Sequence, residues 1–97
     1  MAERGDLRIW VVEALRQLGG EGTIVQVSQR IWQLHENDLR ASGDLFYTWQ
    51  YDVRWAAQYL RDTDLLVAVG GSRTKLWTLS DTGKSIAVDL IKTHGRM

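Results

Sequence analysis

The order in which helical and extended patterns follow one another constrains the fold of this chain most strongly. Apolar residues recur every three or four positions in three successive segments, at about 7–18, 25–35 and 45–61. Such spacing gathers apolar side chains on one face of a helix and predicts three amphipathic helices. Two short apolar runs, 65–69 and 76–79, then flank the segment 70–75. They predict a β-hairpin with a long basic tip.

Local signals place the ends of these elements. Asp6 is expected to be the N-cap of the first helix, and Gly19-Gly20 to end it. Thr23 and Ile24 are interpreted as a very short β-bridge before the second helix. The polar segment 35–44 is interpreted as a connecting loop with a possible half-turn around Leu39. Residues 80–83 are expected to break the last strand, and 86–91 to form a final short helix.

Three helices followed by a hairpin have the order of a winged helix-turn-helix. The predicted fold class is therefore α+β and mainly helical, with three helices, a β-hairpin wing and a short C-terminal helix. With 97 residues the chain fits a single domain. We expect its core over about 6–92 and a flexible tail at 93–97.

Composition narrows the class of protein further. The chain has no cysteine, and its N-terminus lacks the apolar segment of a signal peptide, so a cytoplasmic protein is expected. Twelve basic residues balance twelve acidic ones, which argues against a protein that coats DNA by bulk charge. Any binding to nucleic acid must then be local.

The third predicted helix carries a candidate DNA-reading face. Its apolar stripe leaves a polar face on the opposite side, composed of Tyr47, Tyr51, Arg54, Gln58 and Arg61, with Gln50 at its border. Arginine pairs with guanine and glutamine with adenine in the major groove, and tyrosine stacks or binds phosphate. The alternative is an ordinary solvated helix surface. Asp52 lies beside this face and would repel phosphate, unless it accepts from cytosine or orients Arg54.

The hairpin tip carries a second candidate contact with DNA. Arg73 and Lys75 follow Gly70-Gly71, and these glycines allow a close approach to a groove. We expect the two cations to contact phosphates. A tip that only keeps the hairpin soluble is the alternative.

The five tryptophans divide into two groups. Trp49, Trp55 and Trp77 are expected in the core. Trp10 and Trp32 lie off the apolar stripes of their helices, so one or both are expected to be exposed at a partner surface. Exposed aromatic residues and zero net charge support an alternative function, a winged helix that binds another protein and not DNA.

Motifs for catalysis or cofactors are incomplete. Gly83-Lys84-Ser85 resembles the end of a phosphate-binding loop, but that motif needs glycine where Thr78 stands. His35-Glu36 lacks the second histidine of a zinc motif, because Leu39 occupies its position. We therefore expect no enzymatic activity, no metal and no cofactor.

Two segments of the chain are similar to a known family: Tyr51-Asp52-Val53-Arg54-Trp55-Ala56-Ala57-Gln58-Tyr59-Leu60 and Leu76-Trp77-Thr78-Leu79-Ser80-Asp81-Thr82-Gly83. Both resemble the N-terminal winged-helix domain of Mrr-type restriction endonucleases. The similarity spans most of the chain. It implies a module that delivers double-stranded DNA to a separate nuclease in systems that attack foreign or modified DNA. Where that family usually has Asn-Arg, this chain has Tyr51-Asp52.

The nuclease half of that family is absent from this sequence. A stand-alone transcriptional regulator or accessory protein and a fragment of a larger restriction protein are both compatible with it. The partners expected are double-stranded DNA together with a second copy of the chain or a separate effector or nuclease. No membrane partner is expected.

Overall fold

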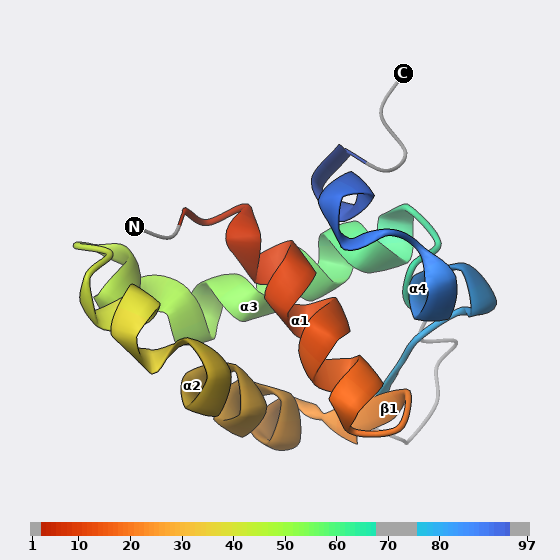
Figure 1. Ribbon diagram of the computed structural model, residues 1–97, viewed down its shortest axis with the longest axis horizontal. Helices are drawn as coiled ribbons and strands as arrows, with labels where there is room; N and C mark the ends of the chain where they lie inside the picture. Colours follow the sequence, from red (N-terminus) through yellow and green to blue (C-terminus); the bar gives the residue numbers. More distant parts are fainter. Residues whose placement is uncertain (1–2, 68–75, 94–97) are drawn as a thin grey trace.

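The computed structural model describes residues 3–67 and 76–93. Its elements run in the order α1 (Asp6–Gln17), β1 (Glu21–Thr23), α2 (Ile24–Arg40), α3 (Leu45–Asp62), β2 (Leu76–Thr78), α4 (Asp81–Ser85) and the 3₁₀ helix η1 (Val88–Thr93). Helices dominate, and a small antiparallel sheet joins β1 to β2 (Figure 1). The prediction of a mainly helical α+β fold is confirmed.

Helix α1 lies across α3 (Figure 1), and their apolar faces meet in one core. The apolar stripe expected on α3 is buried there, at Trp49, Val53, Ala56 and Leu60. Residues of α1, α2, the sheet and η1 complete the same cluster. Burial of these side chains is the main force that holds the helices together.

The sheet pairs segments that are distant in sequence. Strand β1 runs antiparallel to β2 with Glu21 opposite Thr78 and Thr23 opposite Leu76. On the far side of β2, Leu66 forms a bridge with Leu79, and the Val67 amide donates to the Thr78 carbonyl at 2.8 Å. The sequence predicted the pairing of the segment around Leu66 with the segment around Leu79. In place of strand β1 it predicted only a very short bridge at residues 23–24. The rest of the predicted hairpin, residues 68–75, lies outside the described residues.

The expected loop at 35–44 is wrong for most of its length. Helix α2 continues to Arg40, and its backbone departs from helical geometry at His35, where φ is −130°. Two interactions hold this second part of α2. Leu39 is completely buried, and Arg40 pairs with Glu36 one turn earlier at 2.8 Å. The segment is mostly polar, so its composition did not indicate that Leu39 is buried.

The N-cap predicted for α1 is also wrong. Asp6 is the first residue of the helix, and Gly5 occupies the cap position. The Asp6 carboxylate accepts a hydrogen bond from the Glu3 amide at 2.8 Å, so it caps the turn before the helix. Acidic residues in a first helical turn also interact favourably with the helix dipole.

The C-terminal region differs from the prediction in the position of its helix. Residues 81–85, expected as a break, form α4, and Ser80 caps it by accepting from the Gly83 amide at 3.0 Å. Of the predicted helix at 86–91, the part from Val88 onward is the 3₁₀ helix η1, whose Ile91 is completely buried. Residues 94–97, in the expected tail, lie outside the described residues.

Helix α1 and α4 are joined by one side chain. The Arg16 guanidinium donates to the Gly83 carbonyl at 3.0 Å and to the Ile86 carbonyl at 2.6 Å. These carbonyls end the short helix, where a cation also interacts favourably with the backbone dipoles. Arg16 therefore fixes the C-terminal region against the helical core.

Candidate nucleic-acid interface

The face of α3 opposite the core is exposed as predicted. Tyr47 is 83% exposed and Tyr51 is 77% exposed, and Gln50, Arg54 and Gln58 are also exposed. Because the buried residues of α3 fix the rotation of the helix in the core, these five side chains share one outward surface. We call them the α3 face.

Arg54 is the cation at the centre of the α3 face. No carboxylate of the described residues forms an ion pair with it. Gln58, one turn further along, donates to the Asp62 carboxylate at 3.0 Å. Among the described residues Arg54 therefore has no ion pair to exchange when it meets an incoming partner, whereas Gln58 must exchange an internal hydrogen bond for an external one.

Arg61 differs from the other predicted contact residues. Its side chain is half-buried and leans over the Trp77 ring, 5.8 Å from the ring centroid. Its Nε atom is buried and has no hydrogen-bond partner within the described part of the chain. Arg61 thus lies at the edge of the α3 face, close to the sheet.

Asp52, which the sequence pattern places beside the α3 face, interacts with the N-terminal segment. Its side chain is buried and turned toward the N-terminus, with Oδ1 3.4 Å from Arg4 Nε. The Thr48 hydroxyl donates to its other oxygen at 2.9 Å. Asp52 therefore neither orients Arg54 nor adds negative charge to the α3 face.

Arg4 also belongs to a group of cations stacked on aromatic rings. The Arg4 guanidinium lies 4.0 Å from the Trp55 ring centroid, and the Arg8 guanidinium lies 3.6 Å from that of Tyr59. Such contacts stabilise by cation–π attraction. Trp55, expected in the core, is half-buried and forms part of this stack.

Of the two tryptophans of which one or both were expected to be exposed, Trp10 is buried and Trp32 is half-buried. Trp49 and Trp77 are buried as expected. Trp10 is buried too, and its ring stacks on His35 at 4.0 Å between centroids. His35 Nε2 in turn lies 2.6 Å from a Glu13 carboxylate oxygen. The non-helical backbone at His35 places the imidazole on Trp10, which a regular helical pattern does not reveal.

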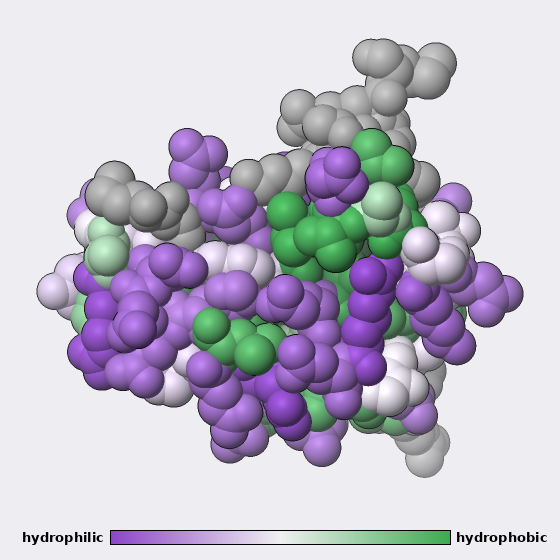
Figure 2. All heavy atoms as spheres, in the orientation of Figure 1, coloured by the Kyte–Doolittle hydropathy of each residue, from purple (hydrophilic) through white to green (hydrophobic). Residues whose placement is uncertain are grey.

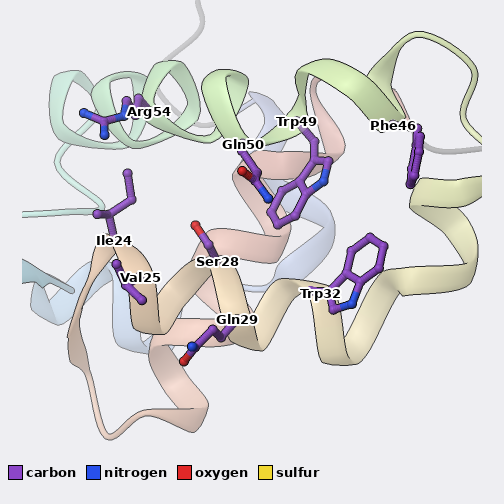
Figure 3. A pocket seen from close by; sticks show the side chains of 9 residues that line it. All are labelled: Ile24, Val25, Ser28, Gln29, Trp32, Phe46, Trp49, Gln50 and Arg54. Carbon is purple, nitrogen blue, oxygen red and sulfur yellow. The ribbon is translucent and has the colours of Figure 1, made fainter.

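A groove borders the α3 face where α2 approaches it (Figure 3). It has a volume of about 610 Å³, within the usual range of small-molecule sites. Its lining residues are Ile24, Val25, Ser28, Gln29, Trp32, Phe46, Trp49, Gln50 and Arg54. Two of them, Gln50 and Arg54, also belong to the α3 face. The sequence marked Trp32 as off the apolar stripe, but it could not bring α2 and α3 together around a groove.

Other predicted features have a simpler placement. Arg73 and Lys75 lie outside the described residues. His35 and Glu13 contact each other, and in the described part of the chain there is no group of three or more potential metal ligands. Within residues 3–67 and 76–93, no helix is both long and apolar enough to cross a membrane.

Comparison with known proteins adds no relative to this picture. No family model, curated protein or solved structure matches the chain. The resemblance to the Mrr-type N-terminal domain therefore remains a prediction from the residues that carry it.

Proposed function

We propose that this chain is a winged-helix protein that binds double-stranded DNA through the α3 face and has no catalytic activity of its own. The observation that carries the proposal is the exposure of Arg54 without an ion-pair partner in the described residues, on the side of α3 opposite the core. A helix that presents Arg, Gln and Tyr in this way matches the groups displayed by base edges and phosphates in the major groove.

Charge and geometry support the same proposal. Pairing of Asp52 with Arg4 removes one acidic group from the helix surface that would approach DNA. The order of three helices followed by a β pairing between Leu66 and Leu79 agrees with a hairpin wing after α3. Arg73 and Lys75 are the phosphate contacts that we propose for this wing. The biological role would be transcriptional regulation or DNA targeting in a restriction system.

Replacement of Arg54 by alanine tests the proposed base contact. The side chain is exposed, so the fold should be unchanged, and discrimination between a preferred and a random duplex should fall by about 1–3 kcal/mol, the usual value of a bidentate contact. The measurement is fluorescence polarisation with duplexes selected from a random library. Arg30, whose guanidinium binds Gln17 at 3.2 Å, provides a matched control, and its alanine variant should keep the discrimination.

Two outcomes would change the interpretation of Arg54. An equal loss of affinity on all duplexes would make it a phosphate contact. No loss on any duplex would contradict the proposed interface.

The proposed wing makes a separate prediction about salt dependence. Each neutralised phosphate adds about 0.9 to the slope of log affinity against log salt, so the double variant Arg73→Ala/Lys75→Ala should flatten that slope by roughly 2. Affinity should fall on every duplex, while sequence preference should change little. Titrations at several salt concentrations, on one selected and one random duplex, measure this. Unchanged slopes in a folded double variant would remove the wing from the interface.

A second candidate function, binding to another protein, rests on a different surface. Figure 2 shows hydrophobic residues gathered around the C-terminal η1 on an otherwise largely polar face. In η1, Val88 is 44% exposed and Leu90 is 53% exposed. Exposed apolar groups of this kind are common at protein interfaces. Sedimentation of the chain alone at rising concentration tests the simplest form of this function, self-association.

A further inference from the structure

The groove between α2 and α3 has two chemically different ends. One end is aromatic and is formed by Trp32, Trp49 and Phe46, while Arg54 lies at the other end near the start of α2 (Figure 3). Between these ends Gln50 and Ser28 point toward each other from the two helices (Figure 3). A ligand that fills this groove must therefore combine an apolar part, a polar middle and a group that suits Arg54.

The aromatic end is suited to a flat ring. The Trp32 and Trp49 rings are nearly parallel, with an interplanar angle of 9° and centroids 6.1 Å apart. Phe46 stands beside Trp32 at 6.4 Å, tilted by 41°. Trp49 is almost completely buried and Trp32 is half-buried, so Trp32 is the more accessible of the two parallel rings. Such rings favour stacking of a flat aromatic group, and nucleic-acid bases stack on them whatever their identity.

The opposite end is electropositive. Arg54 is the charged residue among those that line the groove, and α2 contains no acidic residue before Glu36. The first residues of α2, Ile24 and Val25, line the same end, where the helix dipole places partial positive charge. An anionic group is therefore favoured here, and phosphate matches the Arg54 guanidinium.

We propose that this groove binds a nucleotide, with the base against the accessible Trp32 at the aromatic end, the sugar hydroxyls against Ser28 and Gln50, and the phosphate at Arg54. A nucleotide has the three required parts in the required order. The volume of about 610 Å³ accommodates a single nucleotide. Two sources share this chemistry, a free nucleoside monophosphate and an unpaired nucleotide within a DNA strand.

One consequence rests on the proposed function. Gln50 and Arg54 belong both to the groove and to the α3 face, so a bound nucleotide and duplex DNA cannot both use them. Adenosine monophosphate (AMP) at saturating concentration should then weaken duplex binding. The first test of the nucleotide site uses free compounds without duplex DNA, and the later bulged-duplex test compares two duplexes, so total loss of duplex binding is distinguishable from loss of the preference for an unpaired nucleotide.

Isothermal titration calorimetry with AMP, adenosine and ribose 5-phosphate tests the site. AMP should bind at least about tenfold more tightly than adenosine, because the phosphate gains charge-assisted hydrogen bonds. It should also bind at least about tenfold more tightly than ribose 5-phosphate, because only the base stacks. Equal affinity for all three compounds, or no binding of AMP and no preference for the bulged duplex described below, would overturn the proposal.

Variants separate the two ends of the groove. Arg54→Ala should reduce AMP affinity to that of adenosine, whereas Arg30→Ala, on α2 outside the groove, should leave it unchanged. Trp32→Leu should lower affinity for AMP and adenosine at least about tenfold, with the fold checked by circular dichroism. If Trp32→Leu does not fold, the exposed Arg54 variant still decides, because unchanged AMP affinity there contradicts the proposal.

A bulged duplex distinguishes the two nucleotide sources. AMP binding with the expected variant effects assigns the site to free nucleotides. If AMP does not bind, a duplex with one unpaired adenine should bind more tightly than the fully paired duplex, because unstacking has already occurred. Loss of that preference in Trp32→Leu would assign the groove to an unpaired nucleotide of the strand.

Discussion

Replacement of Gly83 by alanine is expected to destabilise the protein by about 3 kcal/mol or more, at the upper end of the cost of overpacking. A Cβ atom at this position would lie 2.1 Å from the Leu65 carbonyl oxygen and 3.2 Å from Leu79 Cδ2. The first of these atoms belongs to the backbone, so it cannot rotate away. Helix α4 would have to move, and the hydrogen bonds from Arg16 to Gly83 and from the Ser80 amide to Leu65 would be strained.

The sign of this effect is opposite to that expected from helix propensity alone. A glycine in a helix is less favourable than alanine by about 0.5–1 kcal/mol, so a solvated α4 would gain stability from the change. Urea denaturation measures the difference. Thr82→Ala, at the exposed neighbouring position, should change stability by less than about 0.5 kcal/mol. A Gly83→Ala protein as stable as the original would contradict the close approach of α4 to Leu65.

Trp10→Ala is expected to cost about 3–5 kcal/mol of folding stability, the usual range for truncating a buried aromatic side chain. Trp10 is 8% exposed, and its removal also leaves His35 without its stacking partner. Because small domains have only about 5–15 kcal/mol in total, the variant should be strongly destabilised or unfolded.

The Trp10→Ala variant tests the structure against the sequence pattern. In the pattern Trp10 lies off the apolar stripe of its helix, whereas in the structure it is buried. Leu34→Ala provides a control on α2, since Leu34 is 40% exposed, and its loss should be well below that of Trp10. Thermal unfolding followed by circular dichroism measures both. A melting temperature unchanged in Trp10→Ala would place the ring on the surface, which the spacing allowed for Trp10, Trp32 or both.

The candidate site was predicted in part. The α3 face followed from the apolar stripe alone, because four buried positions at helical spacing fix which residues point outward. Tyr47, Tyr51 and Arg54 were identified in this way. The placement of Arg61 over Trp77 and the pairing of Asp52 with Arg4 were not, because each depends on a residue from another element. The groove was missed for the same reason.

Similar reasons explain the errors in the fold. The segment 35–44 has few apolar residues, so local composition indicated a loop, but burial of Leu39 stabilises an extension of α2. Strand β1 is three residues long, and its partner lies more than fifty positions later in the chain. Such a short strand acquires its stability from the pairing itself, so its own residues carry little signal.

The sequence by itself determined the three main helices and the buried face of α3, because helical periodicity is a property of neighbouring residues. The tertiary structure alone decided which polar groups remain available. It paired Asp52 with Arg4, buried Trp10 against His35 and left Arg54 without an ion-pair partner in the described residues. These outcomes depend on contacts between segments that are far apart in the chain, and no local pattern encodes them.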